Sequence, residues 1–254
     1  MTFEQFSTGN SLLHQTDPRV KITAALFLSV LLALCHNLIT ACAGLLLAFC
    51  LLAIAKIPLT LLYKRLLLIN SFNFLLWILL PLTYGQQPTV NIASFAISIP
   101  GIWLAALITM KANGILLLFI SLLATSTVAS LGHALQELRV SPRLCMLLLF
   151  SYRYIFVIHQ EYNRLSRAAS LRCFTPGTNL RTYQTYGYLL GMLLVKSWNR
   201  AARVQQAMEL RGFRGTFHSF HALQMKQRDY IVLTGLLGYG FLLLALLLFP
   251  SLPG

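Results

Sequence analysis

Long apolar stretches recur along the chain and constrain its fold more than any other feature. Hydrophobic residues make up 57% of the 254 residues and charged residues only 10%, whereas an average soluble domain is roughly 25% charged. A soluble fold of this size could not hide so much apolar surface, so lipid is its natural solvent. The expected fold class is all-α, a polytopic membrane helical bundle of about five spans, at residues 20–35, 38–55, 66–82, 102–131 and 231–249.

Basic residues alternate along the chain in a way that predicts its orientation. There are 20 Lys plus Arg against 6 Asp plus Glu. Basic residues precede the first segment, separate the second from the third, and crowd residues 132–228, which hold 14 of the 20, whereas the links at 36–37 and 83–101 have none. Because Lys and Arg concentrate in cytoplasmic loops, the N-terminus is expected in the cytoplasm. This rule accounts for the positive charge, and no nucleic-acid partner is expected.

Charge and apolarity together divide the chain into three parts. Residues 1–131 form an expected four-span membrane bundle, residues 132–228 long cytoplasmic helices, and residues 229–254 a C-terminal span. Proline fits the first turn of a helix, so Ser141-Pro142 starts one, and Pro176-Gly177 reads as a turn. These signals predict a short helix ending near Arg139 and two long ones, at 142–173 and 180–212.

The two long helices leave one question of placement open. Their first halves, at 144–150 and 186–195, are apolar enough to lie at the membrane interface or to form a hairpin of two further spans. The second helix carries an apolar stripe and a separate basic face. The stripe contains Leu190, Leu194, Trp198, Ala201 and Met208, and the basic face contains Lys196, Arg200, Arg203 and Arg211.

Each long helix ends in the phrase A-x-x-L-R-x-F, and the two arginines are 39 residues apart. A basic residue at a helix C-terminus is locally favourable by under ~1 kcal/mol, which is the simplest explanation. The repetition favours docking instead, because a small Ala permits close approach, Arg pairs with a carboxylate and Phe fills an apolar pocket. The candidate docking residues are Ala168, Leu171, Arg172 and Phe174 in the first copy, and Ala207, Leu210, Arg211, Gly212 and Phe213 in the second.

With these phrases, the chain resembles the transmembrane T component of energy-coupling factor (ECF) ABC transporters, in the cobalt/nickel branch. That family carries two short Ala-Arg-Gly signatures near the ends of its coupling helices. The matching positions here are Leu171-Arg172-Cys173 and Leu210-Arg211-Gly212, with Leu in place of Ala in both and Cys173 in place of Gly in the first. The phrase at residues 13–21, LHQTDPRVK, also resembles the family's N-terminal phrase, so the resemblance covers nearly the whole chain.

The resemblance implies a coupling scaffold in a bacterial or archaeal cytoplasmic membrane. Arg172 and Arg211 would each dock one of two cytoplasmic ABC ATPase subunits, and the apolar stripe would face either a membrane substrate-binding subunit or the sister helix. The substrate would be cobalt or nickel, with a vitamin as the near alternative. A different class of protein, a membrane adaptor that binds anionic lipid, remains a competing hypothesis.

Catalysis and cofactor binding are not expected of this chain. It contains no G-x-x-x-x-G-K-[ST] phosphate-binding motif, so ATP and magnesium are expected on the partner ATPases. Its six histidines are scattered, with only His218 and His221 close together, so no metal site is predicted. With six acidic residues, paired-carboxylate catalysis is also disfavoured, and an integral membrane enzyme is the third hypothesis.

Overall fold

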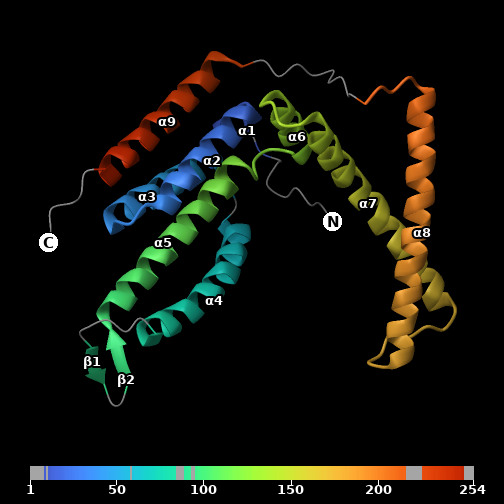
Figure 1. Cartoon of the computed structure of the whole chain (residues 1–254), viewed down its shortest axis with the longest axis horizontal. Helices are drawn as coiled ribbons and strands as arrows, with labels where there is room; N and C mark the ends of the chain where they lie inside the picture. The colour runs from blue at the N-terminus through green and yellow to red at the C-terminus, as the bar shows by residue number, and fades with distance from the viewer. Residues whose placement is uncertain are drawn as a thin grey trace. The chain divides into compact units, whose positions relative to one another are not determined.

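A computed structural model describes residues 9, 11–57, 59–83, 89–92, 95–215 and 225–248 (Figure 1). The chain divides into two compact units. The first consists of Met1–Leu131 with Leu223–Gly254, and the second of Gly132–Ala222. His218, His221 and the end of the last predicted span, Phe249, lie outside the described residues.

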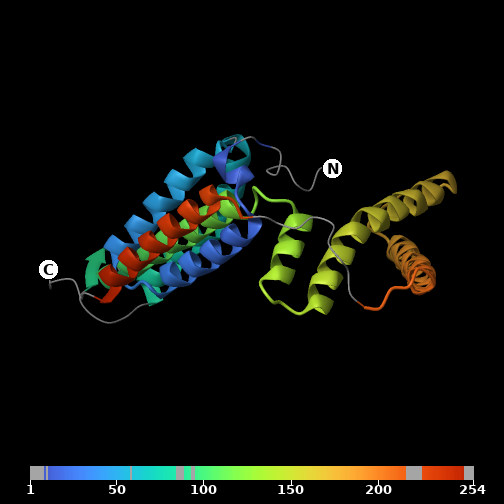
Figure 2. The same ribbon diagram turned by 90° about the horizontal axis from the view of Figure 1, so that it is seen from above.

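The first unit is a helical bundle arranged around α5 (Ile99–Leu122). Helices α2, α3 and α4 pack against α5, and α9 packs against α2 and α3. In Figure 2 the helices α2, α3, α5 and α9 run side by side. The remaining bounds are α1 Leu12–Gln15, α2 Pro18–Leu34, α3 Leu38–Ala55, α4 Leu59–Thr83 and α9 Gln227–Leu248.

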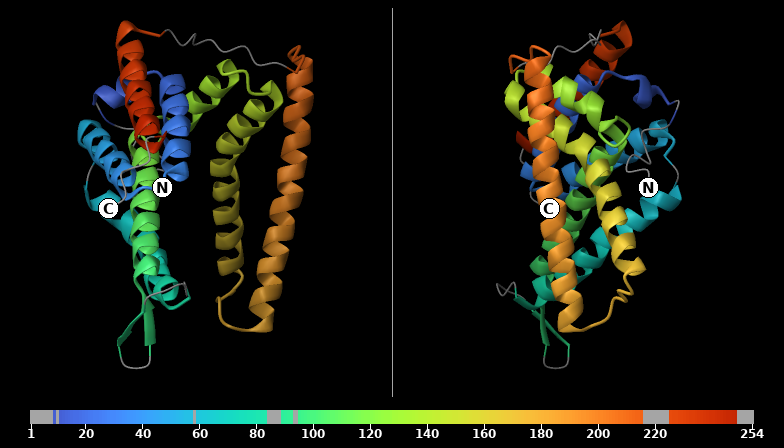
Figure 3. Two further views of the ribbon diagram at one scale, coloured as in Figure 1. Left: turned by 60° about the vertical axis from the view of Figure 1, so that its left-hand side comes forward. Right: turned by 90° about the vertical axis from the view of Figure 1, so that its right-hand side faces the viewer.

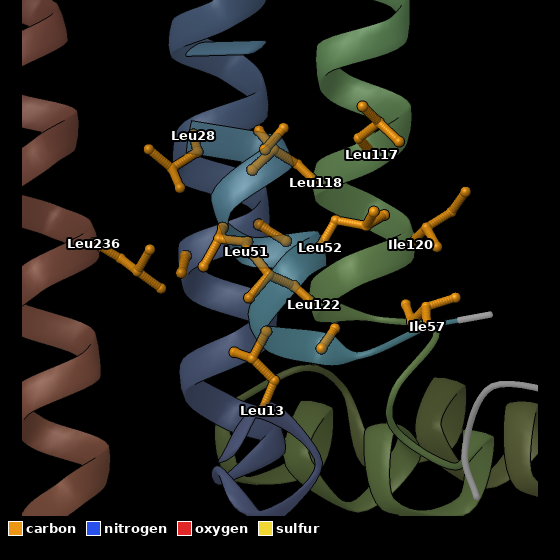
Figure 4. Packing of buried hydrophobic residues seen from close by; sticks show 14 of the residues in the cluster. Leu13, Leu28, Leu51, Leu52, Ile57, Leu117, Leu118, Ile120, Leu122 and Leu236 are labelled. Atoms are coloured by element: carbon orange, nitrogen blue, oxygen red, sulfur yellow. The ribbon is translucent and has the colours of Figure 1, made fainter. Parts of the chain in front are cut away.

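The core of this bundle is built from leucines on four helices. Leu28 of α2, Leu51 of α3, Leu118 of α5 and Leu236 of α9 are all buried and point toward one another (Figure 4). Many large apolar side chains instead lie exposed on the outside of the bundle. That distribution suits a bundle surrounded by hydrocarbon, where outward-facing apolar groups carry no cost.

Four of the described helices are long and apolar enough to cross a membrane, which confirms a polytopic helical bundle. They are Leu38–Ala55, Leu62–Thr83, Ile99–Leu122 and Gln227–Leu247. Helix α2, the first of the five predicted spans, has 17 residues and packs against α5 and α9. Helices α7 and α8 are not among the four, so the structure gives no support to two further spans in the cytoplasmic segment.

The predicted span at 102–131 is confirmed as a membrane-spanning helix, Ile99–Leu122, but its predicted end is wrong, because the structure breaks the segment into two helices. Helix α5 ends at Leu122, and α6 begins at Val128 and ends at Glu137. Hydroxyl groups start the second helix: the backbone N–H of Ser130 donates to Thr127 Oγ1 at 3.2 Å, and the Ser130 hydroxyl donates to the Thr127 carbonyl at 2.8 Å. Such local bonds offer the backbone an alternative to a continuous helix.

The uncharged link before α5 also contains structure that the sequence reading did not predict. Strands β1 (Thr89–Ile92) and β2 (Phe95–Ser98) pair antiparallel, with Thr89 opposite Ser98. Ser98 then caps α5, because its hydroxyl accepts the backbone N–H of Gly101 at 3.4 Å. The short hairpin therefore leads directly into the central helix of the bundle.

The second unit is dominated by two long helices, α7 (Pro142–Leu171) and α8 (Leu180–Leu210). They pack against each other and run antiparallel, joined by residues 172–179 (Figure 3). Their bounds confirm the predicted helices at 142–173 and 180–212 to within two residues. Helix α6 comes close to α7 at Gly132, where an added Cβ would lie 2.7 Å from a methyl group of Leu149.

Candidate docking site

Both copies of the A-x-x-L-R-x-F phrase end their helix with the same set of hydrogen bonds. In the first copy, the N–H of Phe174 donates to the Ala169 carbonyl at 3.2 Å. In the second, the N–H of Phe213 donates to the Met208 carbonyl at 3.0 Å. The residue before each Phe has left-handed backbone, with φ 59° at Cys173 and 78° at Gly212. Together these features form a Schellman C-cap, which satisfies carbonyls that the helix end leaves free.

The cap itself is not specific to the repeat. Helix α6 ends in the same way, with Arg139 at φ 64° and the N–H of Val140 donating to the Leu135 carbonyl at 3.2 Å. That helix end lacks the A-x-x-L-R-x-F phrase. The distinctive property of the repeat must therefore lie in its side chains.

Those side chains are presented outward in both copies. Leu171 and Leu210 are 86% and 89% exposed. The neighbouring Ala168, Arg172, Ala207 and Arg211 are exposed too. An exposed apolar side chain can anchor in an apolar pocket of a partner, and the guanidinium beside it can pair with a carboxylate. Together they can form a small docking contact.

The two phenylalanines behave differently, because each is half-buried and turns back onto the other helix. The ring of Phe174 packs edge-on against Tyr186 of α8, with centroids 5.8 Å apart. Phe213 lines a groove of about 620 Å³ together with Met146 and Phe150 of α7. The phenylalanines thus help to fix the helix ends, while the Leu-Arg pairs remain on the surface.

The antiparallel arrangement places the two copies at opposite ends of the α7–α8 hairpin (Figure 3). Helix α8 has 31 residues, so it is about 46 Å long at 1.5 Å per residue. The repeat therefore presents two similar surfaces that are far apart on one pair of helices.

An acidic residue that the sequence reading missed, Glu161, joins the two helices. Its carboxylate accepts a hydrogen bond from Lys196 Nζ at 2.5 Å, and the guanidinium of Arg200 lies 3.8 Å away. Arg164 of α7 is 3.7 Å from the same carboxylate. The bond from Lys196, with the neighbouring positive charges, lowers the pKa of Glu161 below its usual value. Glu161 is the one acidic residue within the sequence of α7, which was the signal available.

The predicted apolar stripe of α8 is divided: Ala201 and Met208 line the groove shared with α7, whereas its first three residues do not lie against the sister helix. Leu194 and Trp198 are 71% and 77% exposed, and Leu190 is exposed as well. Beside them, Gly187 and Gly191 face open space, since an added Cβ at either position would meet no atom within 4 Å. The side of α8 that faces α7 instead carries Lys196 and Arg200, which the sequence reading had assigned to a basic face.

The described residues contain no group of three or more His, Cys, Asp or Glu side chains placed to hold a metal ion. The neighbouring histidines of the sequence, His218 and His221, are outside the described part of the chain. The features that the structure brings together in the second unit are therefore surfaces for contact with other molecules: two exposed Leu-Arg ends, an apolar groove and an exposed stripe.

Comparisons with known proteins show what the chain is similar to. The family model of the cobalt transport protein CbiQ matches residues 9–222. An energy-coupling factor transporter transmembrane protein EcfT of Acidaminococcus fermentans is 28% identical over 229 residues, covering 85% of this chain and 84% of its own. The EcfT protein of Staphylococcus aureus is 25% identical over 256 residues, covering 93% of both chains. An uncharacterised protein of Methanocaldococcus jannaschii is 25% identical over 182 residues, covering 70% of this chain and 67% of its own.

Proposed function

The chain belongs to the cobalt transport protein family CbiQ, and we propose that it is the energy-coupling transmembrane subunit of an ECF-type ABC importer. On this proposal it transmits the ATP-driven motion of two cytoplasmic ATPase subunits to a membrane subunit that binds the substrate. The observation that carries the proposal is the pair of identically capped, exposed Leu-Arg ends at opposite ends of one hairpin. Two equal surfaces on one chain suit two copies of one partner.

The chemistry of each end defines the partner surface that it requires. Arg172 and Arg211 call for a carboxylate, and Leu171 and Leu210 call for an apolar hollow beside it. Ala168 and Ala207, one turn earlier on each helix, leave room for close approach. Gly212 and Cys173 turn the backbone so that the following Phe does not occupy the docking surface. ATP and magnesium belong to the partners in this scheme, and this chain is not itself an enzyme.

Co-purification from native membranes tests ATPase docking. Arg172→Glu and Arg211→Glu reverse one charge each, and we expect each variant to recover at most half of the ATPase subunits that the wild-type chain recovers. Arg203→Glu is the matched control, because Arg203 is an exposed arginine of α8 outside both copies of the phrase. If Arg203→Glu loses as much ATPase as the other two variants, docking by the repeat is refuted.

The exposed stripe of α8 supports a second contact, with the substrate-binding membrane subunit. Glycines spaced four apart let helices approach closely in a membrane-type interface, and Gly187 and Gly191 lie beside Leu194 and Trp198 on the open side of α8. Gly191→Leu would fill that space, so we expect it to release the substrate-binding subunit and to retain the ATPases. Gly235→Leu is the control, because Gly235 also faces open space but lies on α9. Loss of the ATPases instead of the membrane subunit would contradict this placement.

The proposed substrate is cobalt or nickel, and the name of the matching family supports it. The names of the EcfT relatives specify no substrate, so a vitamin importer is the alternative. The identity of the membrane subunit that co-purifies with the wild-type chain decides between them, followed by uptake of radioactive Co²⁺ by vesicles that contain the complex. The proposed location is a bacterial or archaeal cytoplasmic membrane, with the N-terminus in the cytoplasm, which protease accessibility of an N-terminal tag would test.

A membrane adaptor that binds anionic lipid is the competing function, and the exposed arginines of the second unit favour it. On that function all of these arginines act alike through their charge. Arg203→Glu would then weaken binding to vesicles of phosphatidylglycerol as much as Arg172→Glu does, and no ATPase would co-purify with the wild-type chain.

A further inference from the structure

Three charged residues are buried together at one end of the membrane bundle. Asp17 is 6% exposed, Lys21 2% and Asp229 4%. Burying an ionised group is costly unless it is paired and hydrogen-bonded, and such groups are rare in membrane bundles unless they have a specific task. Lys21 and Asp229 come from opposite ends of the sequence, so the fold gathers them.

The carboxylate of Asp229 uses both of its oxygens to hold two helix starts. Its Oδ1 accepts the backbone N–H of Asp17, the residue that caps α2, at 3.0 Å. Its Oδ2 accepts the backbone N–H of Lys226, just before α9, at 2.9 Å. An asparagine at this position could accept only one of these bonds and would turn an N–H toward the other donor. The site therefore requires a carboxylate.

Lys21 extends the same cluster to a third segment. Its Nζ donates to the hydroxyl of Ser126 at 2.7 Å, in the link between α5 and α6. Basic residues accompany both acids, since Arg19 Nε lies 3.9 Å from the Asp17 carboxylate and Lys226 lines the same cavity as Asp229. Asp17, Lys21 and Asp229 line a cavity of about 330 Å³, together with Thr16, Thr125, Thr127 and Ser130.

The segments that the cluster joins include both connections between the two units. The chain leaves the first unit after Leu131 and returns to it at Leu223. Ser126 lies on the outgoing connection, and Lys226 lies on the returning one, directly before α9, whose first turn holds Asp229. Both covalent connections to the second unit are therefore fastened to the start of α2, within the first unit.

We propose that Asp17, Lys21 and Asp229 are positioning residues that hold both connections to the coupling helices against the start of α2, so that movement of those helices reaches the membrane bundle. The inference rests on the proposed function, since it needs ATP-driven movement of α7 and α8. Without the cluster, the two connections are flexible, and movement of α7 and α8 does not reach the membrane bundle.

Hydrogen exchange of the assembled complex in nanodiscs, with and without ATP plus vanadate, tests the inference. The variants are Asp229→Asn, Lys21→Met and the milder Ser126→Ala, which removes only the hydroxyl that accepts from Lys21. The control is Lys111→Met, because Lys111 Nζ donates to the Ala33 carbonyl at 3.1 Å, near the other end of α2. Without nucleotide, Asp229→Asn should speed exchange of the Asp17 or Lys226 amide at least tenfold.

With nucleotide, wild type and Lys111→Met should show changed exchange in α7 and α8 and at the starts of α2 and α9. In the three cluster variants the change in α7 and α8 should remain, while the change at α2 and α9 falls at least threefold. Loss of stability alone would alter exchange equally with and without nucleotide, so it would overturn the inference. An unaltered nucleotide response at α2 and α9 in Ser126→Ala and in the other variants would overturn it too. If no ATPase assembles with the wild-type chain, the proposed function fails, and this inference falls with it.

Discussion

Adding a side chain at one cap position and removing it at the other should shift the stability of the two helix ends in opposite directions. Cys173 and Gly212 occupy equivalent places in the repeat, and both have left-handed backbone, with φ 59° and 78°. An L-residue with a side chain pays roughly 1–2 kcal/mol for that conformation, whereas glycine does not. The end of α7 therefore carries a strain that the end of α8 lacks.

The magnitude follows from two opposing contributions. Gly212→Ala adds the left-handed strain but also reduces the freedom of the unfolded chain, which returns about 0.4–1 kcal/mol. The net loss is about 1 kcal/mol, and Cys173→Gly should give a gain of similar size. Since 1.4 kcal/mol corresponds to a tenfold change in an equilibrium constant, local opening of each cap should change about fivefold.

Amide hydrogen exchange at the phenylalanines reads out this opening, because their N–H groups close the caps on Ala169 and Met208. We expect the Phe213 amide to exchange about fivefold faster in Gly212→Ala. The Phe174 amide should exchange about fivefold slower in Cys173→Gly. Val140, which closes the equivalent cap of α6, is the internal control and should not change. A shift of the same sign in both variants would refute the assignment of left-handed strain.

Three other predictions concern the packing of each unit. The bond from Lys196 lowers the pKa of Glu161. The ionised carboxylate therefore stabilises α7–α8 packing above the ordinary carboxyl pKa, and this stabilisation is lost as pH falls through the lowered pKa. Distances between spin labels on the two helices should lengthen in acid, and Glu161→Gln should abolish that response. Trp77→Phe removes the hydrogen bond from Trp77 Nε1 to Thr109 Oγ1 at 2.9 Å. It should lower the free energy of unfolding, measured by steric trapping, by about 0.6 kcal/mol. The control variant Trp103→Phe should leave that free energy unchanged. Gly101→Val places a Cβ 2.8 Å from the Leu80 carbonyl oxygen and should cost about 1–3 kcal/mol by the same assay, whereas Gly235→Val, in open space, should cost less.

The features that follow from local rules could be predicted from the sequence. Ser141-Pro142 marked the start of α7, and the apolar run 38–55 matched α3 residue for residue. The family resemblance, made on two short phrases and an N-terminal one, is confirmed by the family match. These signals are local because a helix start, a helix end or an apolar run is encoded by neighbouring residues.

The features that escaped prediction depend on contacts between distant residues or on weak local competition. Hydroxyl groups at Thr127 and Ser130 interrupt an apolar stretch that hydropathy reads as one span. Glu161 gains its role only when Lys196 is brought opposite to it, and Asp229 only when α9 returns to the start of α2. The residues assigned to docking remain a prediction, since their exposure shows that they are accessible but not what binds them.

The spacing of 39 residues between the two Leu-Arg ends has a consequence for symmetry. An antiparallel helix pair has an approximate two-fold axis between its members, and here that axis carries Arg172 of α7 onto Arg211 of α8. A single asymmetric chain thereby offers a local C2 surface to a dimer, the commonest symmetry of protein assemblies. Partner subunits that close about the same axis would apply forces whose components perpendicular to the axis are equal and opposite, and those components turn the hairpin without displacing its centre.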